Sequence, residues 1–324
     1  MFNFLLITHG RNENMLPDKN KNYTGSLIKD IKRDKWIYAL ALIVVAYYVL
    51  FQYLPMYGAI IAFKEYDVVK GIAGSPWVGL KHFKDFINDY YFVRIMRNTF
   101  LLSVFNLLWS FPLTVIFALL LNEIKQQRFK KVVQTATYLP HFISTIVICG
   151  MLIDFLAEDG MISQCIKALG GEAKFYLNYP QYFRTIYITS GIWQSIGWGS
   201  IIYLAALSGI DTQLYEAAMI DGAGRLRQTW NITLPGILPT IVTLLILDIG
   251  KLMNLGYEKI ILLYNGNTYE TADVISTYVY RLGLGEMRRY SYTSAIGLFN
   301  SAINMMLLVS ANHISKKLTE TSLW

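Results

Sequence analysis

The side chains of this chain that could bind a ligand lie mostly inside long apolar segments. One segment carries two aromatic side chains, an amide and a hydroxyl, at Trp193, Gln194, Ser195 and Trp198. Gln194 and Trp198 are four residues apart and therefore share one face of a helix. Aromatic rings that stack, beside groups that hydrogen-bond, suit the binding of a hydroxyl-rich ligand, and the alternative is that the tryptophans only pack or lie at an interface.

Charged and amide side chains interrupt a second apolar segment at Asp248, Lys251 and Asn254. Polar side chains inside a membrane span are costly, so each is a functional candidate. Asp248 and Lys251 are three residues apart and can neutralise each other. Two interpretations stay open, namely a structural ion pair, or a polar wall of a ligand path in which Lys251 contacts an anionic ligand.

Further polar side chains have a structural explanation available. His141 follows Pro140 in another apolar segment, and a lone histidine is usually a satisfied hydrogen-bond partner, although ligand contact is the alternative. Asn300 and Asn304 share a helix face, where we expect interhelical hydrogen bonds. Gly191, Ser195 and Gly199 form a small-residue stripe that suits close helix packing.

The sequence contains no combination of residues that is typical of a catalytic site. No segment combines a nucleophile with a base, or groups histidines and carboxylates at metal-ligand spacing. The G-x-x-x-x-G-K-[S/T] phosphate loop is also absent from the sequence. We therefore predict a chain that is not an enzyme, with no catalytic residue, no metal site and no cofactor.

The composition indicates a membrane protein. The 324 residues are 54% apolar and 16% charged, whereas a soluble protein carries about 25% charged residues. The net charge of +7 comes from basic residues at the edges of apolar segments. We interpret this charge as a determinant of membrane topology and expect no nucleic-acid partner.

Six apolar segments approach the roughly 20 residues that a membrane helix needs. They are about 36–62, 99–121, 134–156, 185–207, 235–254 and 293–312. Pro55 lies near the end of the first, where the helix could break, and Pro140 interrupts the third. The fold class predicted is an all-α integral membrane protein with six transmembrane helices.

Short basic segments set the orientation. Lys29, Lys32, Arg33 and Lys35 precede the first span, and Lys125, Arg128, Lys130 and Lys131 follow the second. Such clusters stay in the cytoplasm, although loop 64–98 also holds basic residues. We expect both termini and loop 208–236 to be cytoplasmic. The domains predicted are a tail at 1–35, a transmembrane domain at 36–312 and a tail at 313–324.

Loop 208–236 is polar and reads SGIDTQLYEAAMIDGAGRLRQTWNITLPG. Asp211 or Thr212 can cap a first short helix, which runs to about Ile220. Gly222 and Gly224 suit a tight turn with unusual backbone dihedrals. A second helix would follow from Arg225 to Thr233, and Pro235 then ends it or begins the next span.

The surface of this loop suits contact with another protein. Ala217 and Ala218 leave room for a close backbone approach, and Glu216 and Arg225 can make charged contacts. From spacing alone, an amphipathic loop that lies on the membrane surface is an equal alternative.

The motif between Glu216 and Pro239 resembles the EAA loop of permease subunits in binding-protein-dependent ABC importers. The matching residues are Glu216-Ala217-Ala218, Asp221-Gly222-Ala223, Trp230 and Ile232-Thr233-Leu234-Pro235. Segments 53–58, 138–144 and 311–315 also resemble carbohydrate-type permeases, in the branch that serves oligosaccharides and polysaccharide fragments.

This resemblance implies a type I importer fold and a set of partners. The expected partners are an ABC ATPase dimer that binds ATP and Mg, a second and different permease, an extracellular solute-binding protein, a carbohydrate and membrane lipid. The expected location is the bacterial cytoplasmic membrane. The residues expected to dock on the ATPase are Glu216, Ala217, Ala218, Asp221, Gly222, Ala223, Arg225, Leu234 and Pro235.

The resemblance also implies alternating access, with sugar contacts from the spans on either side of the loop. The Gln194/Trp198 face lies on the span before it, and Asp248, Lys251 and Asn254 lie on the span after it. The alternatives are an ion-coupled secondary carrier that works without an ATPase, and a membrane enzyme or assembly factor. The sequence shows no obvious inverted repeat of the kind that many such carriers contain.

Overall fold

The computed structural model describes residues 33–285, 287–319 and 322, and divides the chain into a first unit that ends at Gly58 and a second unit, Ala59–Trp324. Residues 1–32 of the predicted N-terminal tail lie outside the described residues. Every element in the described part of the chain is helical, apart from one isolated bridge between Lys64 and Trp77.

One long helical run, Lys35–Phe63, makes up most of the described part of the first unit and continues into the second. It contains α2 (Lys35–Tyr48), a π-helical turn at Val49–Tyr53, α3 (Leu54–Met56) and a 3-10 stretch at Tyr57–Phe63. Pro55 has no N–H to donate to residue 51, and the wider π turn accommodates the lost bond. The helix therefore continues where the sequence allowed a break.

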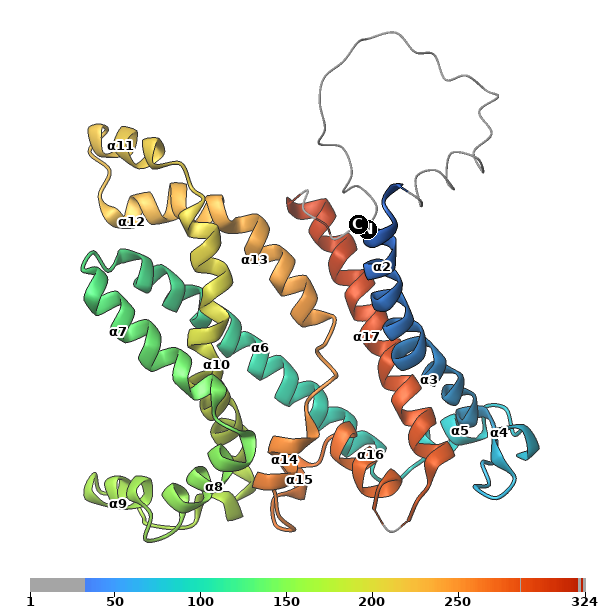
Figure 1. Ribbon diagram of the computed structural model, residues 1–324. Helices are drawn as coiled ribbons and strands as arrows, with labels where there is room; N and C mark the ends of the chain where they lie inside the picture. The colour runs from blue at the N-terminus through green and yellow to red at the C-terminus, as the bar shows by residue number, and fades with distance from the viewer. Residues whose placement is uncertain (1–32, 286, 320–321, 323–324) are drawn as a thin grey trace. The chain divides into compact units, whose positions relative to one another are not determined.

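The second unit contains the remaining helices (Figure 1). They are α4 (Gly71–Gly74), α5 (Lys81–Ile87), α6 (Phe92–Glu123), α7 (Gln127–Tyr138), α8 (Thr145–Leu156), α9 (Met161–Ala168), α10 (Pro180–Ser208), α11 (Thr212–Ile220), α12 (Arg225–Gln228), α13 (Leu234–Ile249), α14 (Tyr257–Leu263), α15 (Tyr269–Ala272), α16 (Ile275–Gly283) and α17 (Tyr290–Thr319). Within this unit, α11 and α12 lie at one end, called here the α11 end, and α14, α15 and α16 lie at the other, the α16 end.

The described helices only partly reproduce the six spans expected. Four runs are long and apolar enough to cross a membrane, namely Lys35–Phe63, Phe92–Glu123, Arg225–Ile249 and Tyr290–Lys317, and a bent pair makes a fifth. Helix α10 has 29 residues and covers the predicted span 185–207, but it is not among these apolar runs. Helix α17 continues to Thr319 and so extends into the predicted tail 313–324.

The expected third span is not one straight helix. Helix α7 ends at Tyr138, a 3-10 turn follows at Leu139–Phe142, and α8 begins at Thr145. The helical segments on either side of the break meet at 99°. The change of direction lies at Ile143 and Ser144, whose backbones are extended with ψ of 133° and 139°. Pro140, which cannot donate a helical hydrogen bond, lies in the 3-10 turn just before them.

Helix α10 is the centre of the packing in the second unit. It contacts α6, α7 and α13 along its length, and Figure 1 shows it running between the two ends of the unit. Towards the α11 end, these contacts bury an apolar cluster made of Val115, Ala118, Tyr203, Leu207 and Ile237. Many apolar side chains on the outer faces stay exposed, including Leu108, Trp109 and Met305, as expected for helices that contact lipid.

Hydrogen bonds from α17 fix the segment after α13. The Asn304 Oδ1 accepts a bond from the Met253 N–H at 2.9 Å, and the Asn300 Nδ2 donates to the Met253 carbonyl at 3.2 Å. The asparagine face therefore hydrogen-bonds to another segment, as predicted, but its partner is the backbone of the connection after α13 and not a helix.

A carboxylate joins several elements at the α16 end. The hydroxyls of Tyr278 and Tyr292 donate to Asp89 Oδ2 at 2.7 and 2.6 Å. Burial raises the pKa of Asp89, but hydrogen bonds from Tyr292, the Tyr91 N–H and Tyr278 more than offset it, so the pKa lies below its usual value. Burial and the bond to Asp89 raise the pKa of Tyr278 to about 12. At neutral pH this end is therefore held by an ionised carboxylate and neutral phenols.

Small residues set the closest helix approaches. A Cβ at Gly197 would collide with the backbone of Thr137 in α7, and one at Gly199 would come within 3.0 Å of Thr114 in α6. A Cβ at Gly191 would meet nothing closer than 3.7 Å. The predicted stripe therefore packs closely at Gly199 and loosely at Gly191, and the tightest contact is at Gly197, outside the stripe.

We predict that Gly197→Ala destabilises the protein by about 1–3 kcal/mol, as overpacking usually does. The matched control Gly191→Ala has room for its methyl group, so it is expected to be neutral or slightly stabilising. Apparent Tm and folded yield in detergent check this difference. Equal behaviour of the two variants would contradict the close approach of α7 and α10.

Candidate functional site

The polar loop 208–236 folds as a pair of short helices at the α11 end. The Asp211 Oδ1 accepts a bond from the Gln213 N–H at 2.9 Å, and α11 runs from Thr212 to Ile220. Gly222 has φ of +75°, which a residue with a side chain rarely adopts. The cap at Asp211, the helix end and the need for Gly222 are confirmed. Gly224, with φ of −67°, is in a conformation open to other residues, so this part of the expectation is wrong.

The second helix of the pair continues into a membrane-length helix. Helix α12 leads into a π turn at Thr229–Thr233 and then into α13, so Arg225–Ile249 is one helical run of 25 residues. Pro235 lies in the first turn of α13, and the π turn before it accommodates its missing N–H. Two roles were predicted for Pro235, to end the second short helix or to begin the next span. It lies at the beginning of α13, and the helix before it continues into α13 without a break.

Three side-chain contacts position this pair of helices. The hydroxyls of Tyr215 and Thr233 are 2.9 Å apart and join α11 to the π turn. The Gln228 Nε2 donates to the Ala223 carbonyl at 2.9 Å within the turn. Arg225 is 3.3 Å from Glu123 at the end of α6. A displacement of α11 would therefore also displace the start of α13.

Much of the surface of the helix pair is apolar and uncovered. Ile220 is 87% exposed, Leu226 is 79% exposed and Trp230 is 69% exposed. Of the predicted docking residues, Glu216, Ala217, Asp221, Gly222, Arg225 and Pro235 are exposed, and Ala218, Ala223 and Leu234 are half-buried. Exposed apolar side chains around charged ones suit an interface with another protein.

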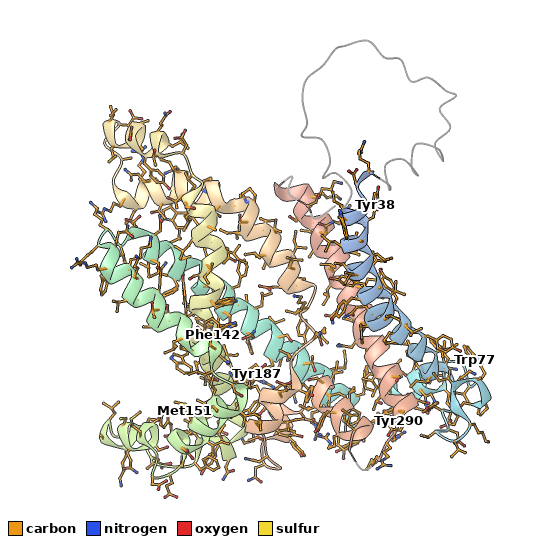
Figure 2. All side chains as sticks on the ribbon, in the orientation of Figure 1. Tyr38, Trp77, Phe142, Met151, Tyr187 and Tyr290 are labelled. Atoms are coloured by element: carbon orange, nitrogen blue, oxygen red, sulfur yellow. The ribbon has the colours of Figure 1, made fainter. Side chains whose placement is uncertain are left out.

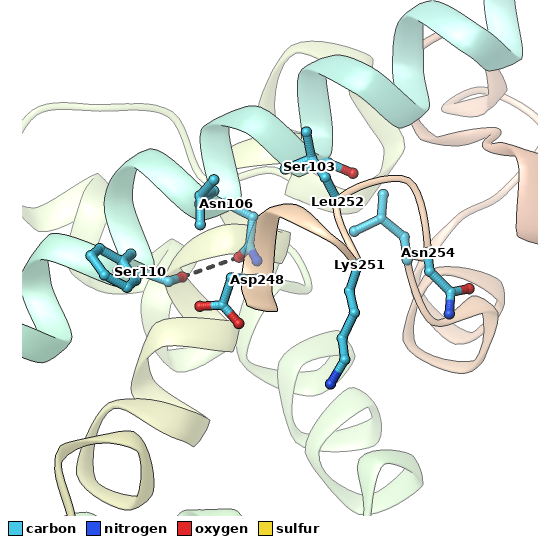
Figure 3. A pocket seen from close by; sticks show the side chains of 10 residues that line it. Ser103, Asn106, Ser110, Asp248, Lys251, Leu252 and Asn254 are labelled. Carbon is cyan, nitrogen blue, oxygen red and sulfur yellow. Dashed lines mark hydrogen bonds between the residues drawn. The ribbon is translucent and has the colours of Figure 1, made fainter. Parts of the chain in front are cut away.

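A polar cavity of about 210 Å³ lies between α6 and the segment after α13 (Figure 3). It brings together Asp248, Lys251 and Asn254, as the sequence suggested. Its wall on α6 carries Ser103, Asn106 and Ser110, which sequence reasoning missed. Their helical spacing of three and four residues within an apolar span was the available signal.

Asp248 and Lys251 do not form an ion pair in the described structure, although the Lys251 N–H donates to the Asp248 carbonyl at 3.1 Å. The Lys251 side chain points away from the Asp248 carboxylate (Figure 3). The ammonium therefore stays available at the mouth of the cavity, where the alternative interpretation placed a ligand contact.

A second group of candidates lies where α10 meets the turn before α8. The His141 ring stacks on Trp198 with centroids 4.7 Å apart and planes at 4°, and Phe142 meets Trp198 edge-on. Trp193 and Trp198 remain 48% and 44% exposed. The Ser195 hydroxyl donates to the Gly191 carbonyl of its own helix at 2.7 Å, so its donor is already used, whereas Gln194 is half-buried on the same side.

Lys259 links these two groups and was missed in the sequence. Its Nζ is 5.2 Å from the centre of the Tyr187 ring and 3.4 Å from the Tyr187 carbonyl. A Cβ built on Gly191 would meet Lys259 Nζ at 3.7 Å and the Asn106 amide oxygen at 4.0 Å. The ammonium thus lies between the α10 face and the cavity wall on α6. The one feature of the local sequence that could have indicated this site is a lysine directly before the apolar residues of α14. Phe142 and Tyr187, one from each side of this region, lie near the middle of the second unit (Figure 2).

Among the described residues, no group of three or more histidine, cysteine, aspartate or glutamate side chains could hold a metal ion. What the described site offers is therefore stacking, hydrogen bonding and positive charge.

Comparisons with known proteins agree on one family. Residues 92–320 match the family described as binding-protein-dependent transport system inner membrane component. The chain is 44% identical to protein LplB of Bacillus subtilis (strain 168) over 295 residues, which are 91% of this chain and 92% of LplB. It is also 44% identical over 299 residues to YteP, a polygalacturonan/rhamnogalacturonan transport system permease protein of the same organism, with 92% of each chain covered.

Solved structures agree with this match. A chain of a bacterial ABC transporter involved in the import of the acidic polysaccharide alginate has a TM-score of 0.84 and 42% sequence identity, covering 91% of this chain and 99% of that chain. A chain of a bacterial alginate ABC transporter, solved in complex with an alginate pentasaccharide-bound periplasmic protein, matches with the same TM-score, identity and coverage.

We predict that Tyr215→Phe loosens α11, because it removes the bond to Thr233. A lost neutral hydrogen bond costs about 0.5–1.5 kcal/mol, so amide hydrogen exchange in α11 should become about 2- to 10-fold faster. Tyr257→Phe is the control, since the Tyr257 hydroxyl bonds to no described residue. Unchanged exchange in α11 after Tyr215→Phe would show that this contact does not hold the helix pair.

Proposed function

This chain belongs to the family of binding-protein-dependent transport system inner membrane components, and from that premise we propose that it is the permease subunit of an ABC importer that takes up an oligosaccharide. A separate ATPase dimer, which binds ATP and Mg, would supply the energy. A second and different permease would complete the membrane part, and an extracellular solute-binding protein would deliver the sugar.

The observation that carries the coupling proposal is the continuity of Arg225–Ile249. The exposed pair α11–α12 lies at one end of this run, and the run itself is long and apolar enough to cross a membrane. The bonds at Tyr215 and Arg225 fix the pair to α13 and α6. An ATPase that moved the pair would therefore turn or shift α13 as a rigid lever.

The charge distribution supports a cytoplasmic location for the α11 end. Lys125, Arg128, Lys130 and Lys131 lie in the short connection after α6 and in the first turn of α7. Lys316 and Lys317 lie in the last turn of α17. Basic residues next to spans remain in the cytoplasm, so the α16 end would face the solute-binding protein and both termini would be cytoplasmic.

The sugar path proposed runs past the two groups of polar residues. The stacked His141 and Trp198 offer an aromatic surface, and Asn106, Lys251 and Asn254 offer hydrogen-bond donors in the cavity. Two similar proteins are named for polysaccharide transport, one for polygalacturonan/rhamnogalacturonan and one for the acidic polysaccharide alginate, and this supports an oligosaccharide.

Alternating access follows if ATP binds the two states unequally. ATP closes the ATPase dimer, the two permeases' helix pairs approach each other, and the spans open outward to take sugar. Hydrolysis reverses these steps. In this proposal the ATPase stays bound to the helix pair during both the closing step and its reversal.

Affinity purification of the tagged chain from gently solubilised membranes tests the assignment. The proposal predicts recovery of an ABC ATPase and a second permease, identified by mass spectrometry. A known importer that keeps its ATPase in the same detergent is the control. If the chain is recovered alone under those conditions, an ion-coupled carrier becomes the better explanation.

Substitutions in the helix pair test the coupling step. Glu216→Lys reverses an exposed charge, and a charged contact is worth about 1.5–3 kcal/mol, so ATPase affinity should fall about 10- to 100-fold, and uptake should fall with it. Glu158→Lys, an exposed residue between α8 and α9, is the matched control and should keep wild-type uptake.

Gly222→Pro should also uncouple transport, because proline fixes φ near −65° where the turn has +75°. Gly224→Pro is the matched backbone control, since Gly224 already has φ of −67°. Both variants should insert normally in the membrane. Wild-type ATPase association and uptake in Glu216→Lys and Gly222→Pro would refute the coupling role of this pair.

A further inference from the structure

A second cavity, of about 370 Å³, lies at the α16 end and is rich in arginine. It is formed by the start of α6 and by α15. The lining residues that carry the argument are Tyr90, Tyr91, Arg94, Arg97, Asn98 and Glu270. The volume lies in the range of about 300–1,000 Å³ that is usual for small-ligand sites.

The wall behind this cavity holds more positive than negative charge. Asp273 is fully buried, and both Arg94 and Arg281 bind its Oδ2, at 3.2 and 2.9 Å. One carboxylate thus faces two guanidinium groups. The Arg94 Nε is buried without a hydrogen-bond partner, so this arginine has donor capacity that Asp273 does not use.

Asn98 positions a further arginine beside the cavity. The Asn98 Nδ2 donates to the carbonyls of Glu270 and Asp273 at 2.8 and 3.1 Å, which fixes the orientation of its amide. Its Oδ1 accepts from Arg184 Nη2 at 2.9 Å. The Arg184 Nε is also buried and unpartnered. Because Asn98 is neutral, this bond orients Arg184 without cancelling its charge, which the Glu270 carboxylate offsets in part.

Arg97 is the exposed cation of the cavity. It makes no hydrogen bond or ion pair with any described residue, and it is close enough to Arg184 for the two positive charges to repel each other. Arg94 and Arg97 thus line the cavity beside Glu270, and Arg184 and Arg281 lie behind it. Cations gathered in a concave site attract anions strongly, and an arriving anion would relieve the repulsion.

Aromatic rings complete the site. Tyr90 is 89% exposed and packs edge-on against Tyr91 with centroids 5.1 Å apart. The Arg94 guanidinium lies 4.6 Å from the centre of the Tyr91 ring. Exposed tyrosine faces suit the apolar faces of sugar rings, and the planar guanidinium fork matches a carboxylate.

We propose that this arginine pocket binds the carboxylate of an acidic sugar residue as the oligosaccharide leaves the solute-binding protein. The inference rests on the proposed function and gives it a substrate class, a uronate-containing oligosaccharide. The shared chemistry is an oxyanion, which a lipid phosphate could also supply. The exposed Tyr90 ring and the concave shape favour a sugar, because a phosphate alone uses neither.

The test uses the full chain with its co-purifying subunits in nanodiscs of phosphatidylcholine, without nucleotide. The probes are trigalacturonate and its fully methyl-esterified form, which has the same rings without the charges. We expect the acid to bind about 10-fold more tightly than the ester, and Arg97→Gln to abolish this difference. Arg97 is exposed, so its substitution should not impair folding. The control is Arg128→Gln, in α7 near the α11 end, which should keep the difference in affinity between the acid and the ester.

Several results would overturn the proposal. Equal affinity for acid and ester, or an unchanged difference in Arg97→Gln, rejects the carboxylate site. If Arg97→Gln releases co-purified phosphatidylglycerol while trigalacturonate binding is unchanged, the pocket takes a lipid phosphate. If the variant loses affinity only for the solute-binding protein, the pocket is a docking contact. Each of these outcomes is independent of ATPase recovery, so failure of the pocket and failure of the importer assignment can be told apart.

Discussion

In the hydrocarbon of a membrane a backbone N–H or C=O has no water to bind, so each must be satisfied within the protein. Helices satisfy these groups in the long apolar runs of the described chain, and they continue past Pro112 in α6 and Pro239 in α13. A π turn lies just before Pro55 and another lies just before Pro235, and the helix is continuous at both prolines. Shortly after Pro140, between Phe142 and Thr145, the chain instead bends by 99°. Some of the polar side chains within the long helices line the cavity beside Asp248, namely Ser103, Asn106 and Ser110.

The mechanical role proposed for the helix pair depends on helix continuity at Pro235. A break there would let α11 and α12 move without α13, whereas the π turn joins them in one run. The Tyr215–Thr233 bond closes the pair onto this run. At the other end, the Asp89 and Asp273 networks join α5, α6, α16 and α17 through buried hydrogen bonds and ion pairs. The two groups of residues proposed to contact sugar therefore lie between two ends that are held by these networks.

Local chemistry was predictable from the sequence, and long-range assembly was not. The Asp211 cap, the turn at Gly222 and the asparagine face of α17 follow from residue types and spacing over a few positions. The bend after Pro140 depends on what surrounds the proline, which spacing does not reveal. Lys259 and the arginine pocket were missed because they arise where distant segments meet: Arg94, Arg184 and Asp273 belong to three separate parts of the chain.

Site-specific photocrosslinking in cells tests the central claim, that α11 and α12 contact an ATPase. A photoreactive residue at Leu226, which is 79% exposed, should capture an ABC ATPase, identified by mass spectrometry. The same residue at Leu169, which is 88% exposed and follows α9 at the other end of the second unit, should not. Capture of the ATPase from Leu169, or from neither position, would contradict the account.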